Sequence, residues 1–215
     1  MARSAVRRSA ARPRWQRRKQ ARPAEIVAAA LQVFVERGFA AARLEEVARR
    51  AGVTKGTVYL YFRGKEALFK AVVRETLVPC IAAGEALAQA HTGTARELFA
   101  ILVREWWRVI GDPPISGIPK LMLAEAVNFP ELARFYYEEV VRRGHRLIAS
   151  VLERGIASGE FRQIDVKAAA RLVIAPLLQA VQWRHSFALC SQEPLDMATY
   201  LETHLDIVLR GIANA

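Results

Sequence analysis

Apolar residues recur at helical spacing through most of the chain, and glycine and proline residues mark where each run stops. The first run begins at Pro23, which suits the first turn of a helix, and stops at Arg37-Gly38. Its apolar positions are Ile26, Val27, Ala30, Leu31 and Phe34. The pattern therefore predicts a first helix that has one buried face.

Two short helices are predicted next, separated by a tight turn. The apolar positions of the first are Leu44, Val47, Ala48 and Ala51. Gly52 then supplies the backbone freedom for a sharp turn, and Thr54 stands where its hydroxyl would cap the next helix. Three helices within about forty residues, the last two joined by a glycine turn, are typical of a helix-turn-helix.

The remaining runs are also helical. A helix begins at Lys65 and is expected to kink or end at Pro79, and a capping-box pattern, Thr94 with Glu97, opens another that ends near Gly111. Further helices are predicted at 119–127, 130–158, 165–189, with an interruption at Pro176, and 195–212, opened by Pro194. Strand-like alternation is missing from the pattern, so the predicted fold class is all-α.

Charge divides the chain into a basic part and a neutral part. Residues 1–22 carry nine basic groups and no acidic group, and the net charge of +11 resides entirely in the first 64 residues. Residues 1–22 also offer almost nothing to bury, so we expect a flexible basic arm. An N-terminal part that faces a polyanion is thus joined to a neutral helical body.

Composition argues against several other classes of protein. Cys80 and Cys190 form no CxxC pair, the four histidines are dispersed, and no nucleophile or phosphate-loop motif is present. The longest uncharged stretches fall short of a membrane span of roughly 20 residues, and no secretory signal is visible. We therefore expect a cytoplasmic protein that is not an enzyme and uses no metal or cofactor.

Residues 54–61 carry the candidate chemistry. Gly56 costs helix stability, about 1 kcal/mol relative to alanine, but a residue without Cβ lets the helix backbone approach base edges in a major groove. Thr54, Lys55 and Thr57 offer donors for bases or phosphates beside it. Tyr59 and Tyr61, on either side of the helix, would each reach a phosphate.

The stretch AGVTKGTVYLYFRGKEALF resembles the signature of the TetR/AcrR family of transcriptional regulators, and the match runs from about Ala24 to Phe69. The resemblance implies a homodimeric DNA-binding protein, usually a repressor, whose C-terminal domain binds a small effector and pairs through its last two helices. It implies a basic arm at 1–22, a DNA-binding domain at 23–68 and an effector-binding and dimerisation domain at 69–215. Lys65, at the start of the next helix, would add positive charge near backbone amides that favour an anion.

The chain departs from the family pattern just before the second helix. Family members commonly place threonine or serine there, whereas this chain has Ala42 and Arg43. Arg43 would hold a phosphate by charge, but the cap contribution of about 1 kcal/mol is lost.

Aromatic and apolar residues of the body are candidates for lining an effector cavity, although such residues more often form the core. The candidates are Trp106, Trp107, Met122, Phe129, Phe135, Tyr136, Trp183 and Phe187. A neutral, apolar and aromatic body favours a hydrophobic effector such as a metabolite, a drug or a fatty-acyl compound.

Two other functions fit the sequence. In the first, the arm alone binds nucleic acid or an anionic membrane surface without sequence preference, and the body only oligomerises. In the second, the body is a helical enzyme that retains a DNA module without using it. Contact of the arm with DNA, beyond the recognition helix, is compatible with the regulator reading as well.

Overall fold

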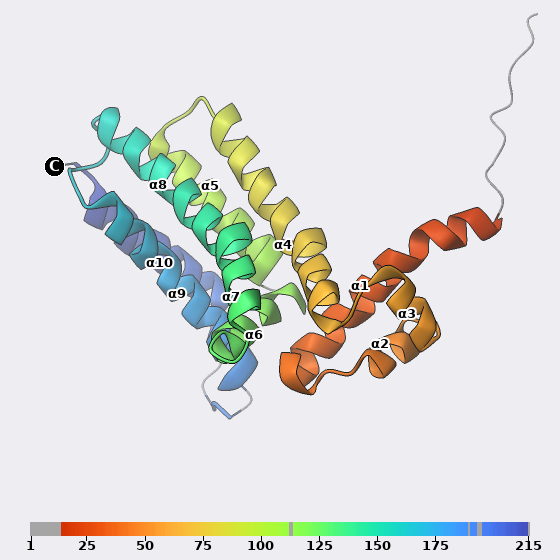
Figure 1. The fold of residues 1–215 in the computed structure, drawn as a ribbon. Coiled ribbons are helices and arrows are strands. Elements are labelled where there is room, and N and C mark those ends of the chain that lie inside the picture. The colour runs from red at the N-terminus through yellow and green to blue at the C-terminus, as the bar shows by residue number, and fades with distance from the viewer. Residues whose placement is uncertain (1–13, 112–113, 189, 193–194, 215) are drawn as a thin grey trace, which may run out of the picture.

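The computed structural model describes residues 14–111, 114–188, 190–192 and 195–214, and helices make up almost all of these residues (Figure 1). No β-strand occurs in these ranges, where Phe161 and Ala213 form one isolated β-bridge. The α-helices are α1 (Arg14–Ala41), α2 (Leu44–Arg50), α3 (Lys55–Tyr61), α4 (Lys65–Ala90), α5 (Ala95–Trp106), α6 (Gly117–Glu125), α7 (Pro130–Tyr136), α8 (Arg142–Ala157), α9 (Val166–Ser186) and α10 (Met197–Ile212). A short 3₁₀ helix, η2 (Pro114–Ser116), and two π-helical segments, η1 (Trp107–Gly111) and η3 (Tyr137–Val141), complete the list. The predicted all-α fold is confirmed.

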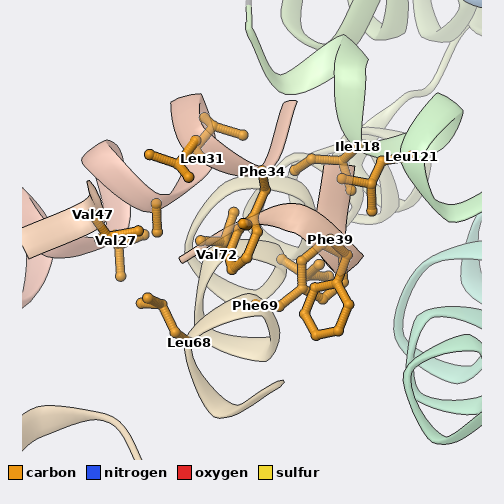
Figure 2. Packing of buried hydrophobic residues seen from close by; sticks show 14 of the residues in the cluster. Val27, Leu31, Phe34, Phe39, Val47, Leu68, Phe69, Val72, Ile118 and Leu121 are labelled. Carbon is orange, nitrogen blue, oxygen red and sulfur yellow. The ribbon is translucent and has the colours of Figure 1, made fainter. Parts of the chain in front are cut away.

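Aromatic side chains hold the N-terminal helices against the start of α4. Phe34, Phe39 and Phe69 pack with ring centroids 5.5–5.6 Å apart, and Leu68 and Val72 are fully buried beside them (Figure 2). Such aromatic pairs stabilise by about 0.5–1.5 kcal/mol beyond the area that they bury. This core fixes the orientation of the helix-turn-helix relative to α4.

The same core continues into the larger part of the molecule through α6. Ile118 and Leu121 of α6 lie beside Phe34 and Phe39 (Figure 2), and the carboxylate of Glu125 accepts a hydrogen bond of 3.0 Å from the backbone N–H of Ala40. The predicted boundary between residues 68 and 69 therefore passes through a continuous hydrophobic core.

A second core joins the C-terminal helices. Leu98 and Phe99 of α5, Leu152 of α8 and Leu205 of α10 are buried together, and Phe161 closes one end of the cluster. In Figure 1, α4, α5, α8, α9 and α10 run alongside one another as a helical bundle on one side of the molecule. The helix-turn-helix lies at the end of this bundle.

The helix boundaries match most of the sequence predictions. Gly38 has φ 78° and ψ 165°, which ends the regular part of α1 where Arg37-Gly38 predicted a stop. The capping box of Thr94 and Glu97 is present with both of its hydrogen bonds, and the side chain of Asp165 caps α9. Local polar signals thus determined where these helices begin and end.

Predictions based on proline were less accurate. Helix α1 begins at Arg14 rather than Pro23, so residues 14–22 are helical and not a flexible arm, while residues 1–13 lie outside the described residues. Pro79 does not end α4, and Pro176 lies inside α9, where its carbonyl accepts a hydrogen bond of 2.9 Å from Tyr200. A proline removes one backbone hydrogen bond, and side-chain bonds and packing elsewhere in these helices outweigh that loss.

The start of the last helix also differs from the prediction. Pro194 lies outside the described residues, and α10 begins at Met197. The carboxylate of Asp196 accepts a hydrogen bond from the backbone N–H of Ala198 and caps the helix. The capping carboxylate, rather than the proline, therefore sets this boundary.

Candidate nucleic-acid interface and candidate effector cavity

Helix α3 is built as the second helix of a helix-turn-helix. Gly52 adopts φ 64° in the turn after α2, a conformation that costs glycine little. Thr54 has extended backbone and its hydroxyl accepts a hydrogen bond of 3.2 Å from the backbone N–H of Thr57. The predicted turn and the predicted N-cap are both confirmed.

One face of α3 is buried and the other is open. Val58 is fully buried, and Val53 and Phe62 at the two ends of the helix pack against the same core. On the outer face Tyr59 is 49% exposed, and a Cβ added at Gly56 would meet only the hydroxyl of Thr54, at 3.9 Å. The backbone at Gly56 is therefore accessible from outside, as its predicted role requires.

Lys55 is held by an acidic neighbour. Its ammonium forms an ion pair with Glu45 of α2 and lies 5.8 Å from the ring centroid of Tyr59. The hydrogen bond to Glu45 raises the pKa of Lys55, so the side chain is fully protonated at neutral pH. Glu45 was not predicted as a partner of Lys55, because only the packing of α2 against α3 brings the two side chains together.

Lys65 points toward the protein interior rather than only toward solvent. Its ammonium donates hydrogen bonds to the carbonyls of Ala40, at 2.8 Å, and Ala42, at 3.3 Å, and lies 4.8 Å from the ring centroid of Phe39. Burial lowers its pKa. Lys65 thus satisfies carbonyls at the end of α1, and its predicted contact with DNA would use its remaining donor.

The other predicted DNA contacts lie around the same surface. Arg43 is exposed at the start of α2 and makes no side-chain cap, as the departure from the family pattern implied. Thr57 is half-buried, and its hydroxyl shares a hydrogen bond of 2.9 Å with that of Thr54. Tyr61 is half-buried and packs against the core, so only part of its ring faces outward.

The larger part of the molecule contains a cavity of about 610 Å³. Residues from α4 to α9 line it, and apolar side chains such as Leu77, Leu102, Ile148 and Leu177 dominate its wall. A volume of this size is within the usual range for small-molecule sites. Three of the eight predicted effector residues are in its lining: Trp106, Met122 and Tyr136.

The other five predicted effector residues are not among the residues that line the cavity. Phe129 packs on Phe39 at 4.7 Å, and Phe135 stacks under Lys70 and Arg74. Trp107 lies under Arg184, and Trp183 packs against Phe187. Their aromatic character reflects packing and cation–π contacts, which residue type alone does not distinguish from ligand contact.

Both π-helical segments contribute to the cavity wall. Arg108 and Ile110 belong to η1, and Tyr137 and Val140 belong to η3. A π-helical turn shifts the register of the following side chains and often occurs at functional sites. The sequence carries no signal for this shift, which explains why Tyr137 was missed.

Few polar side chains line the cavity. Arg108 pairs with Glu105 at 2.6 Å, and both side chains are substantially exposed, so this pair marks an open side. His145 also lines the wall, and burial, with a smaller effect of Arg171, lowers its pKa. The thiol of Cys80 donates a hydrogen bond of 3.0 Å to the carbonyl of Thr76. The interior therefore presents neutral groups at pH 7.

The described residues offer neither a metal site nor a membrane-spanning helix. They contain no group of three or more histidine, cysteine or acidic side chains that is placed to hold a metal ion. None of the helices in these ranges is long and apolar enough to cross a membrane.

Two family models match the chain. Residues 26–72 match the model described as bacterial regulatory proteins, tetR family, and residues 97–210 match the C-terminal domain of the AefR-like transcriptional repressors. Together these segments include α3 and most of the helices that line the cavity.

Relatives align over almost the whole chain. The fatty acid metabolism regulator protein of Bacillus subtilis is 27% identical over 201 residues, which cover 91% of this chain and 99% of the relative. The transcriptional repressor KstR2 of Rhodococcus jostii is 26% identical over 198 residues, which cover 91% of this chain and 93% of the relative.

Solved structures share the fold. The ketosteroid transcriptional regulator KstR2 of Mycobacterium tuberculosis superposes with a TM-score of 0.71 at 25% identity, over 90% of this chain and 96% of that chain. The fatty acid degradation regulator FadR of Bacillus halodurans superposes with a TM-score of 0.71 at 25% identity, over 87% of this chain and 94% of that chain.

Proposed function

Because the chain belongs to the TetR family of bacterial regulatory proteins, we propose that it is a homodimeric repressor that binds a two-fold symmetric operator and releases it when a hydrophobic effector binds. The observation that carries the proposal is the joint presence of an outward α3 with bare backbone at Gly56 and a cavity of about 610 Å³ connected to it by α6. A protein of this kind acts in the cytoplasm, where the DNA is.

The relatives support a lipid-like effector. Those described above are named as regulators of fatty acid metabolism, of fatty acid degradation or as ketosteroid regulators, and fatty acids and steroids are both largely apolar. The wall of the cavity, rich in leucine, isoleucine and valine, matches such a molecule. We propose that this chain responds to a compound of the same general kind.

Helix α6 supports communication between the cavity and α3. Met122 lines the cavity, while Ile118 and Leu121 on the same helix are buried in the core beneath the helix-turn-helix. An effector that moves α6 would move α1, and with it the spacing of the two α3 helices in a dimer. Release requires that the effector bind the state that does not fit DNA more tightly than the state that does.

Selection of bound fragments from random duplexes tests the DNA half of this proposal. The full chain is expected to enrich a two-fold symmetric sequence, and Lys55→Ala should weaken binding and reduce its salt dependence. Arg146→Ala is the matched control, because it removes an exposed cation on α8. Enrichment of no sequence would contradict the proposal and favour the sequence-indifferent anion binder.

Removal of the N-terminal segment separates the two functions further. Because α1 begins at Arg14, the appropriate truncation removes residues 1–13 and leaves the helix intact. Preserved operator preference with a shallower salt dependence is expected of a regulator. If the arm alone supplies affinity, removal of four of its nine basic groups is expected to weaken binding to all DNA sequences alike, with no operator preference before or after truncation.

We propose that helices α9 and α10 form the dimer surface. Exposed residues of α9 recur at a spacing of three and four, which is the repeat of a helix-pairing seam. They are Ala168, Leu172, Ala175, Gln179 and Gln182. Leu172 is 71% exposed, and Ile207 on α10 is 66% exposed.

Charged substitutions on this surface test the dimer. Leu172→Glu combined with Ile207→Glu is expected to give a monomer in light scattering, with loss of operator binding, because a charge would be buried in the seam. Val127→Glu is the control, since Val127 is 90% exposed on another face. A double variant that remains dimeric would place the interface elsewhere.

A further inference from the structure

Tyr136 is an unusual member of the cavity wall. It is 9% exposed, and its hydroxyl makes no hydrogen bond with any group in the described part of the chain. Two side-chain polar atoms in that part of the chain are fully enclosed and lack a partner: Nε1 of Trp183 and Nε2 of His204. The hydroxyl of Tyr136 is not one of them, so it is not fully enclosed. It therefore reaches open space, and the open space next to Tyr136 is the cavity.

An unpaired hydroxyl in an apolar wall is costly. Leaving a polar group of a nearly buried side chain without a partner costs up to about 1–3 kcal/mol, so phenylalanine is expected to be at least as stable at this position. Burial raises the pKa of Tyr136, so the phenol stays protonated and remains a donor. The arrangement is explained if a ligand supplies the missing acceptor.

The other polar groups of the wall indicate the charge of that acceptor. Trp106, a half-buried lining residue, has only a neutral polar group, its indole N–H, and the lowered pKa of His145 keeps its imidazole neutral at pH 7. Both charged groups of the lining, Glu105 and Arg108, are paired with each other at the open side. Among the described residues that line the interior of the cavity, no cation is available to balance a buried anion.

Resting on the function proposed above, we propose that Tyr136 selects the effector by donating a hydrogen bond to a neutral acceptor. The effector is then a long apolar molecule with a carbonyl of an ester, thioester or ketone inside the cavity. An anionic group, where the molecule has one, remains outside at the side of Glu105 and Arg108. A free carboxylate is not the group that the interior binds.

The geometry also limits the position of this carbonyl. Tyr136 and His145 lie nine residues apart on the continuous helical stretch of α7, η3 and α8, which corresponds to roughly 13 Å along the helix axis. The carbonyl is recognised at the Tyr136 end. The rest of the apolar molecule fills the cavity toward Leu147 and Ile148.

Three probes of similar chain length test the proposal on the full-length protein: methyl dodecanoate, dodecanoate at pH 8 and the hydrocarbon tridecane. Displacement of an environment-sensitive dye gives the affinities. The ester is expected to bind wild-type protein at least tenfold more tightly than dodecanoate. Tyr136→Phe is expected to weaken the ester by about tenfold, the effect of one hydrogen bond between neutral groups, and to leave tridecane unchanged.

Thermal unfolding without ligand separates a ligand contact from a structural role. Tyr136→Phe removes a hydroxyl that has no partner, so its Tm is expected to equal or exceed that of the wild type. Tyr200→Phe is the comparison, because the hydroxyl of Tyr200 donates to the carbonyl of Pro176, and its Tm is expected to fall. A Tm loss in Tyr136→Phe as large as that of Tyr200→Phe would overturn the proposal.

Further outcomes distinguish this inference from the proposed function. The role of Tyr136 is overturned if Tyr136→Phe and the wild type bind the ester with equal affinity, or if dodecanoate binds more tightly than the ester. Release of operator DNA by the ester would, even then, support the proposed regulator function. If none of the three probes binds the wild type, both the ligand class and the hydrophobic effector are wrong. Operator binding measured in the same samples would still report on the DNA half independently.

Discussion

At the scale of single residues, the ion pair between Lys55 and Glu45 involves a side chain that we propose to contact DNA. Both side chains are more than half exposed, and pairs of this kind contribute about 0–1 kcal/mol to stability. The carboxylate of Glu45 pairs with the ammonium that, under the proposed function, would bind a phosphate of the operator. If Lys55 binds DNA as proposed, Glu45 competes with the phosphate for it.

Glu45→Gln should strengthen operator binding. Loss of the competing carboxylate frees Lys55 and removes a negative charge near the DNA, so the affinity is expected to rise roughly two- to fivefold, with a steeper salt dependence. The Tm should change little. Fluorescence anisotropy at several salt concentrations measures the effect, and Glu153→Gln, which removes an exposed acid of α8, is the control. Unchanged or weaker binding by Glu45→Gln would contradict the competition.

Gly56→Ala should separate stability from DNA binding. An added Cβ meets nothing closer than 3.9 Å, and alanine favours the helix by about 1 kcal/mol, so the Tm is expected to rise. Operator affinity should nevertheless fall by an amount comparable to a lost base contact, about 1–3 kcal/mol, because the backbone is kept from the bases. Calorimetry and anisotropy on the same preparation check both. A variant that gains stability and keeps full affinity would show that close backbone approach is not needed.

At the scale of secondary-structure elements, α6 is the connection between the two parts of the molecule. A Cβ added at Gly117 would lie 2.6 Å from Cγ2 of Val35 on α1, whereas nothing lies within 4 Å of one added at Gly144 on α8. The contact between α1 and α6 thus depends on the absence of a side chain at Gly117.

Gly117→Ala is therefore expected to destabilise the protein. Separating α6 from Val35 costs roughly 1–3 kcal/mol by overpacking, which exceeds the gain in helix propensity of about 1 kcal/mol. Gly144→Ala, the matched control, should raise the Tm, since it adds only the propensity gain. The variant at Gly117 should also need a different effector concentration for operator release. If both variants gain stability equally, the tight contact between α6 and α1 is not rigid.

The elements that could be predicted from the sequence are those whose ends depend on local chemistry. Thr54, Thr94 and Asp165 cap helices through bonds to residues three positions away, and such bonds are visible in the sequence. Prolines misled the prediction because Pro79 and Pro176 lie within long packed helices whose other contacts compensate for one missing bond.

The cavity wall was predicted less well than the exposed outer face of α3. Thr54, Lys55, Gly56 and Tyr59 lie on one short helix, so sequence order alone brings them together. The residues around Tyr136 come from α4 to α9, and η1 and η3 shift their register by π-helical turns. Which aromatic side chains face the cavity is thus decided by tertiary packing, and the sequence pattern does not contain that information.

At the scale of the whole molecule, buried histidines make stability depend on pH. Burial lowers the pKa of His145, His185 and His204 in the folded state. Positive neighbours add to this effect for two of them, Arg171 for His145 and Lys120 and Arg184 for His185. In the unfolded chain a histidine titrates near 6.5.

The sign of the effect follows from proton binding. As the pH falls below about 6.5, the unfolded chain binds protons at these histidines before the folded protein does, so the unfolded state is favoured. The free energy of unfolding should therefore decrease from pH 7.5 to pH 5.5. Carboxylates with lowered pKa, such as those of Glu46 and Glu85, lose their contribution only nearer pH 4 and do not account for this window.

Replacement of the most enclosed histidine tests this reading. His204 is 7% exposed, and its Nε2 has no partner among the described residues, so a proton added there would be buried without an acceptor. His204→Leu should therefore reduce the loss of Tm between pH 7.5 and pH 5.5, whatever its effect at pH 7.5 alone. Thermal unfolding of both proteins across this range gives the two slopes. Equal slopes would mean that His204 gains its proton without unfolding. The acid sensitivity would then have to arise at His145, which lines the cavity, and at His185, which bonds to Ser116 just before α6.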